Sequence, residues 1–93
     1  MIKQNSILAK KKNVTCTELP DGEAVLLNLE NRYFYTLNQD AFSVWKHLNG
    51  KYKLIDIADR IVKQSGIDIQ EAVGAVLEQA GEFMDEGLIE IAP

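Results

Sequence analysis

The sequence has little of the chemistry that catalysis, metal binding or membrane insertion needs. It contains one cysteine, one histidine and no apolar run near the roughly 20 residues of a membrane-spanning helix. The single thiol, Cys16, excludes an internal disulfide and a zinc site built from several cysteines. No glycine-rich phosphate loop is present, and no pair of carboxylates is set up as acid and base. We therefore expect neither catalytic activity nor a bound cofactor or metal.

Targeting signals are missing as well. The first 12 residues include four lysines but no apolar stretch long enough for a signal peptide, so we expect a cytoplasmic protein. The 93 residues suffice for one domain, and an apolar fraction of 46% is ordinary for a folded chain. Residues 1–12 are polar, lysine-rich and without periodicity. They predict a flexible basic arm before a single domain over residues 13–93.

The first half of the chain has the alternating pattern of β-strands. Residues 14–19 are β-branched and alternate, and the Pro-Asp-Gly segment at 20–22 has the residue types of a tight turn. The alternation continues over residues 23–29. A short reversal is predicted at residues 30–31, because Asn31 tolerates the left-handed backbone that such a turn needs. A third strand over residues 32–37 follows it. Three short antiparallel strands in a meander are therefore predicted.

Helical periodicity replaces this alternation after Asn38, whose side chain is suited to cap a helix. Apolar spacing predicts three helices, one from Asn38 to Leu48 with Gly50 as its stop, one over residues 54–65 and one over 68–86. Residues 88–91 have the composition of a short final strand. The segregated order predicts an α+β domain, in which a three-stranded antiparallel sheet is followed by three helices that cover one of its faces.

The second and third helices have the arrangement of a helix-turn-helix, and the added strands favour a winged helix-turn-helix-like shape. A nucleic-acid-binding regulator is therefore the alternative function. The distribution of charge argues against it. All ten Lys and Arg lie at or before Lys63, whereas residues 64–93 contain seven acids and no Lys or Arg. Affinity for DNA comes largely from cations at phosphates, so the acidic third helix should repel a duplex.

Three consecutive aromatic residues, Tyr33, Phe34 and Tyr35, stand in the predicted third strand. A half-buried strand hides only alternate side chains, so either both of its faces are covered or one face is kept for a partner. Leu37 directly precedes the helix cap and should face the core. This assigns Tyr33 and Tyr35 to the core face and leaves Phe34 and Thr36 on the other.

Further motifs lie around this strand at fixed spacing. They are EAVLLNLENRYFYTLN, then Ala41 and Trp45, then the Leu-Asn-Gly segment at 48–50, and finally the ending MDEGLIE. Through them, residues 19–91 resemble the PqqD-like family, the small peptide chaperones of pyrroloquinoline-quinone synthesis and their relatives, which are also called RiPP recognition elements. Each motif is loose, but their order and spacing together are fairly specific.

The resemblance implies a domain that binds the leader segment of a ribosomally made precursor peptide and presents it to a modifying enzyme, such as a radical SAM maturase or a leader protease. In such domains the leader adds a strand to the edge of the third strand and lies against the third helix. The acids Glu78 and Glu82 would meet basic residues of the leader. The implied peptide-binding residues are Arg32, Tyr33, Phe34, Tyr35, Thr36, Val73, Val76, Leu77, Ala80 and Gly81.

Some alternatives stay open at the level of single residues. For Phe34, groove lining and ordinary sheet packing explain the sequence equally well, whereas core packing is favoured for Tyr35 and Trp45. Gly74 and Gly81 lie inside the third helix, where close packing or the approach of an outside chain would explain them. A third function, pairing of the edge strand with another copy, predicts a homodimer. The resemblance does not single out one biosynthetic pathway.

Overall fold

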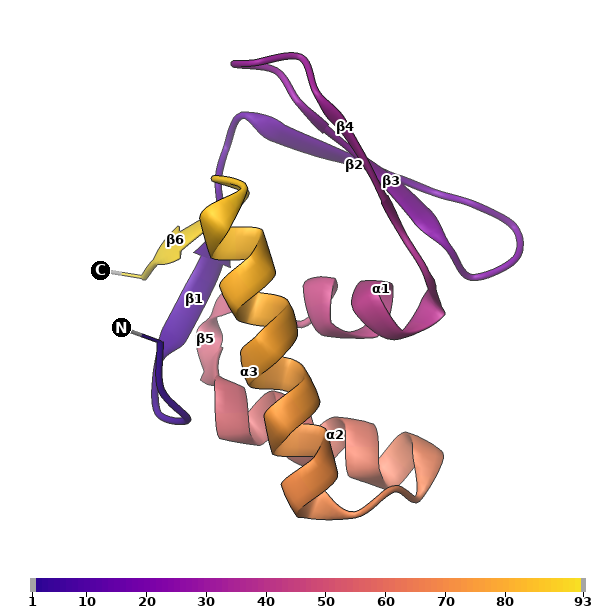
Figure 1. Cartoon of the computed structure of the whole chain (residues 1–93), viewed down its shortest axis with the longest axis vertical. Coiled ribbons are helices and arrows are strands. Elements are labelled where there is room, and N and C mark those ends of the chain that lie inside the picture. The colour runs from indigo at the N-terminus through magenta and orange to yellow at the C-terminus, as the bar shows by residue number, and fades with distance from the viewer. Residues whose placement is uncertain (1, 93) are drawn as a thin grey trace.

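The computed structural model describes residues 2–92, which form two sheets and three helices. The strands are β1 (Ile7–Lys10), β2 (Val14–Glu18), β3 (Ala24–Asn28), β4 (Phe34–Leu37), β5 (Asn49–Lys53) and β6 (Ile89–Ile91). The helices are α1 (Gln39–Trp45), α2 (Leu54–Ser65) and α3 (Ile69–Asp85). One antiparallel sheet has the strand order β5-β1-β6 and the other the order β2-β3-β4 (Figure 1). The α+β class is as predicted, but the first of these sheets was not.

The helix boundaries follow from local capping. The Asn38 side chain accepts a hydrogen bond from the Ala41 N–H at 2.8 Å and so begins α1, as predicted. Asp68 begins α3 by accepting from the Gln70 N–H at 3.0 Å. Gly66 ends α2 with a φ of 76°, a left-handed conformation that glycine adopts at little cost.

Residues 2–12 do not form the flexible arm that was predicted for residues 1–12, of which Met1 lies outside the described part of the chain. Residues 7–10 form β1, the central strand of its sheet, where Leu8 is fully buried. The chain is held even before this strand, because the Leu54 N–H bonds to the Ser6 carbonyl at 3.0 Å. Lys10, the last residue of β1, is half-buried, and its Nζ lies 5.5 Å from the centroid of the Trp45 ring. A lysine tolerates such a position because its stem is apolar.

Helix α1 ends three residues before the predicted end at Leu48, and the chain that joins it to α2 contains a strand that was not predicted. Helix α1 ends at Trp45, and residues 49–53 pair with β1 as strand β5. Gly50 has a φ of 78° within this strand, so its assignment to a helix stop is wrong. Exposed residues alternate with half-buried ones along β5, but two of the exposed ones are Lys51 and Lys53, and we did not interpret this polar segment as a strand.

A single core lies between the sheets and the helices. Trp45 on α1 and Phe83 on α3 meet edge to face, with ring centroids 5.2 Å apart and planes at 77°. The β2-β3-β4 sheet contributes Leu26 and Leu37 to this core, and the other sheet contributes Leu8. Helix α3 runs along the molecule from α2 at its start to β6 at its end (Figure 1). Core packing of Trp45 is therefore confirmed.

Candidate functional site

Strand β4 lies at an edge of the β2-β3-β4 sheet. It pairs with β3 on one side, and no strand within residues 2–92 pairs with it on the other. Its last residue, Leu37, leads through Asn38 into α1 (Figure 1). An unpaired edge presents backbone N–H and C=O groups that can join another strand. The open side of β4 is thus the first element of the candidate site.

The register of β4 identifies which backbone groups face outward. The Asn28 N–H bonds to the Tyr33 carbonyl at 3.0 Å, and the pairing then continues one residue at a time with Leu26 opposite Tyr35. Hydrogen-bonded and non-hydrogen-bonded pairs alternate in an antiparallel ladder, so the backbone groups of Tyr35 point to β3. Those of Phe34 and Thr36 consequently point to the open side, where they lack a strand partner among the described residues.

The two faces of β4 differ as predicted from Leu37. Leu37 is buried and Tyr35 packs against the core, whereas Phe34 and Thr36 are exposed on the outer face. Tyr33 precedes the strand and is 65% exposed, so the core does not extend far enough to cover it. Phe34 is 70% exposed. Ordinary sheet packing therefore accounts for Tyr35 but not for Phe34.

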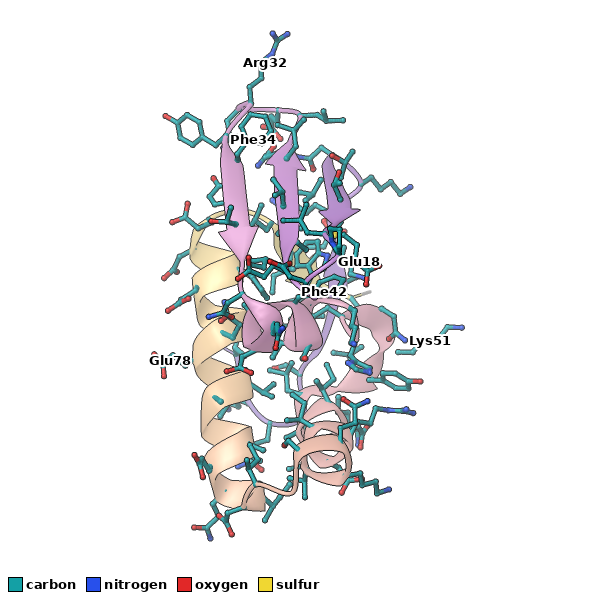
Figure 2. The ribbon with its side chains drawn as sticks, turned by 90° about the vertical axis from the view of Figure 1, so that its right-hand side faces the viewer. Glu18, Arg32, Phe34, Phe42, Lys51 and Glu78 are labelled. Atoms are coloured by element: carbon teal, nitrogen blue, oxygen red, sulfur yellow. The ribbon has the colours of Figure 1, made fainter. Side chains whose placement is uncertain are left out.

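The turn before β4 is built on a buried amide. Asn28 is almost fully buried, and its Oδ1 accepts from the Glu30 N–H at 2.9 Å and from Asn13 Nδ2 at 2.8 Å. The Arg32 N–H bonds to the Asn28 carbonyl at 2.7 Å. Arg32, and not the expected Asn31, takes the left-handed conformation, with a φ of 65°. Its side chain points away from the helices at the far end of the hairpin (Figure 2).

A pocket of about 260 Å³ lies between β4 and the C-terminal half of α3. We call it the β4–α3 groove. Its apolar residues come from β4, α1, α3 and the residue before β6. Its polar residues come from α3 and its C-cap, and from the last part of β4 and the residue after it. The apolar ones are Tyr35, Leu37, Ala41, Phe83 and Leu88, and the polar ones are Thr36, Asn38, Gln79, Glu82 and Glu86. A narrow site with an apolar floor and an acidic rim therefore borders the open strand.

The predicted helix residues lie elsewhere on α3. Val76 and Ala80 are fully buried in the core, and Val73 packs against that core. Leu77 and Gly81 line a separate pocket of about 540 Å³ together with Ile2, Met84, Asp85 and Ile91. We had assumed that apolar residues beside the core stripe would form the groove wall. The structure instead brings the predicted Tyr35 and Thr36 together with polar residues at the C-terminal end of α3. Of the two acids that were expected to meet the leader, Glu82 lines the groove and Glu78 does not.

The two glycines inside α3 are not explained by close packing. A Cβ atom added at Gly74 or Gly81 would have no neighbouring heavy atom within 4 Å, apart from the adjacent residues and the helix backbone. Both positions therefore have room for a side chain. The interpretation that a neighbouring element demands a glycine there is wrong.

The described residues offer little to catalysis. Partial desolvation raises the pKa of the Cys16 thiol, which lowers the fraction of reactive thiolate at neutral pH. His47 Nδ1 lies 2.8 Å from the Ser43 carbonyl within the same helix region. Within residues 2–92 no three His, Cys, Asp or Glu side chains gather as metal ligands would. Over the same residues, no helix combines the length and apolar composition needed to cross a membrane.

These features define a class, a small α+β domain in which an open edge strand borders a helix-lined groove. The family model for coenzyme PQQ synthesis protein D (PqqD) matches residues 23–89. The chain belongs to the PqqD family, which confirms the resemblance found in the sequence.

Solved structures share the fold at low sequence identity. TbiB1 in complex with the TbiA(beta) leader peptide is 20% identical, with a TM-score of 0.80 over 88% of this chain and 94% of that one. Lasso peptide synthetase B1 complexed with the leader peptide is 14% identical, with a TM-score of 0.80 over 91% and 99%. The PqqD truncation of Methylobacterium extorquens PqqCD, a stand-alone RiPP recognition element, is 16% identical, with a TM-score of 0.81 over 97% and 95%. No match was found among curated proteins.

Proposed function

We propose that this chain captures the leader segment of a ribosomally made precursor peptide by strand addition to β4 and presents it to a modifying enzyme. The observation that carries the proposal is the open edge of β4 beside the β4–α3 groove. Membership of the PqqD family supports it, as do two structures of the same fold that are complexes with leader peptides. The nucleic-acid-binding alternative is not favoured, because α3 carries no basic residue.

The register suggests how the guest is held. Its backbone would exchange hydrogen bonds with Phe34 and Thr36, the two residues whose N–H and C=O groups point to the open side. Its side chains opposite Tyr35 would point into the groove, and the alternate ones would extend the outer row that includes Phe34. Arg32 and Tyr33, which directly precede β4, would contact the guest at that end of the strand. Ordering each guest residue costs about 1–2 kcal/mol, so we expect transient capture.

The domain's own role in this proposal is recognition and not chemistry. The modifying enzyme, such as a radical SAM maturase or a leader protease, would supply the reaction, and capture would take place in the cytoplasm where the precursor is made. We also propose that α2 and α3, which pack together and are joined by residues 66–68, form a winged helix-turn-helix-like unit with the β2-β3-β4 sheet. A homodimer through β4 would compete with the guest for the same edge.

Titration with the precursor peptides encoded beside the gene of this chain tests the proposal. Amide shifts observed by NMR should concentrate on β4 and on the groove-facing side of α3, with Phe34 and Thr36 amides gaining protection from exchange. Light scattering of the free chain at several concentrations controls for β4 pairing between copies. Binding that leaves β4 unperturbed, or no binding to any neighbouring precursor, would contradict strand addition.

A further inference from the structure

We infer that the guest strand is basic, and that a Lys or Arg side chain enters the β4–α3 groove so that its cation meets Glu82 and Glu86. The inference rests on the proposed strand addition and specifies the chemistry of the captured peptide. The apolar stem of this guest Lys or Arg would cover the groove floor. Three features of the groove lead to this conclusion, namely its unpaired carboxylates, their place on the helix and the shape of the floor.

The rim of the groove on α3 is acidic and has no cation of its own. Glu82 and Glu86 line it with Gln79, whose Nε2 donates to Glu82 Oε2 at 3.3 Å. Within residues 2–92 the one ion pair joins Lys63 to Asp59 on α2. Neither groove carboxylate therefore has a cationic partner in the described part of the chain, and no Lys or Arg follows Lys63 in the sequence.

The position of these acids on the helix strengthens the negative potential. Glu82 and Asp85 lie in the last turn of α3, Glu86 is its C-cap residue, and no basic residue stands in that turn. The C-terminus of a helix carries the negative end of the macrodipole, where acids are unfavourable and cations are stabilising. The groove thus opens where the helix and its carboxylates add their negative potentials. A guest cation would relieve this repulsion.

Two of the basic residues, Lys51 and Arg60, are directed away from the rim or engaged elsewhere. Lys51 on β5 and Glu78 on α3 point to opposite sides (Figure 2). Arg60 on α2 is engaged with the Tyr52 ring, with Cζ 4.2 Å from its centroid. The groove acids Glu82 and Glu86 therefore remain open to a cation from another chain. Their negative charge would also speed the approach of a basic peptide at low salt.

The groove floor favours a cation on a long apolar stem. A guest side chain that points inward beside Tyr35 would meet the buried Leu37, Ala41 and Phe83, and the exposed carboxylates line the same groove. Lys and Arg bury such a stem on an apolar surface while their charged head stays in a polar setting. A purely aliphatic guest residue would fill the floor but leave the carboxylates unpaired, and an acidic one would be repelled.

Selection from a display library of short random peptides tests this inference with the full chain. Three proteins are compared, namely the unaltered chain, Glu82→Lys/Glu86→Lys, and the matched control Glu78→Lys/Asp85→Lys. The control makes the same change in net charge, but its two residues, Glu78 and Asp85, do not line the groove. We expect the unaltered chain and the control to enrich Lys or Arg over Asp or Glu at alternate positions by about tenfold, since each exposed ion pair gives a modest gain.

The groove variant should instead enrich Asp or Glu, and raised salt should weaken the binding of basic peptides to the unaltered chain. Selected peptides are then assayed against Thr36→Pro. If they need the Thr36 N–H but show no basic preference, or if the groove variant keeps that preference, the inference is wrong while strand addition stands. If no peptide is selected, or none depends on Thr36, the proposed function fails and this inference fails with it.

Discussion

Trp45 and Phe83 meet edge to face across the core, and Phe83 also forms part of the floor of the β4–α3 groove. One side chain thus belongs to the core and to the candidate site. Trp45 also contacts the other sheet, because Lys10 Nζ on β1 lies 5.5 Å from the centroid of its ring. The unpredicted sheet and the groove are therefore connected through two aromatic side chains.

Replacing Phe83 with Ala should lower the free energy of unfolding by about 3–5 kcal/mol, because it removes a buried ring and leaves a cavity beside Trp45. Urea unfolding followed by Trp45 fluorescence measures the change. Phe34→Ala is the matched control, since this ring is exposed, and its effect on unfolding should stay within about 0.5 kcal/mol. Similar losses for the two variants would contradict the burial assigned to Phe83.

Thr36→Pro should abolish peptide capture while leaving the fold intact. Proline has no N–H, and the Thr36 N–H points to the open side of β4 and not to β3. Fluorescence anisotropy with the precursor peptide measures binding, and circular dichroism checks the fold. Thr36→Val keeps both the N–H and the β-branched shape, so it should bind normally.

Tyr35→Pro is the counterpart of Thr36→Pro, because it removes an N–H that faces β3 and not the open side of β4. The Tyr35 N–H faces β3, so the variant should lose ladder hydrogen bonds and unfold more readily than Thr36→Pro. Equal stability of the two proline variants, measured by thermal unfolding, would show that the register of β4 is wrong.

Leu8→Ala should destabilise the chain by about 2–5 kcal/mol, because Leu8 is fully buried on the central strand of the β5-β1-β6 sheet. A flexible arm would tolerate this change without effect. The exposed Lys12 supplies a control in the same segment, and Lys12→Ala should change the midpoint of thermal unfolding little.

Stability should decline through the pH range in which thiols titrate, by a contribution that disappears in Cys16→Ala. Partial desolvation raises the pKa of Cys16 in the folded chain, and the nearby Lys10 opposes that shift. Between the ordinary and the raised value, the unfolded thiol ionises while the folded one stays protonated, so rising pH favours unfolding. Urea midpoints of the two proteins across this range measure the difference. Midpoints that separate in the opposite direction would contradict the raised pKa.

The strands and helices that were predicted correctly carry strong local signals. Asn38 marks the start of α1, and the Pro-Asp-Gly turn at 20–22 separates two alternating segments that became β2 and β3. The missed strands are short and flanked by lysines. In β1 three apolar residues precede Lys10, and in β5 Tyr52 stands between two lysines. Both strands depend on pairing with each other, a long-range contact that no local window contains.

The candidate site was likewise predicted in one part, the strand, and missed in most of the other, the helix wall. The strand itself was predicted over residues 32–37 from its alternation and aromatic residues, whereas its role as a docking edge came from the resemblance to the PqqD-like family. The helix wall was placed on apolar residues, yet those at 76 and 80 are needed by the core. Of the polar rim, Glu82 was expected to meet the leader, whereas Gln79 and Glu86 were not, because polar residues at helical spacing resemble any solvated helix face. Only the approach of β4 distinguishes that face from others.

Strand β1 lies between β5 and β6, and the Ala92 N–H reaches the Ile7 carbonyl at 2.9 Å. The first and last strands are thus neighbours in the sheet that does not contain β4 (Figure 1). A covalent tether attached at either terminus therefore leaves the domain from the same place, remote from the open strand. Fusion to an enzyme, attachment to a solid support, or circular permutation through a short linker between the termini should all leave the capture edge unobstructed.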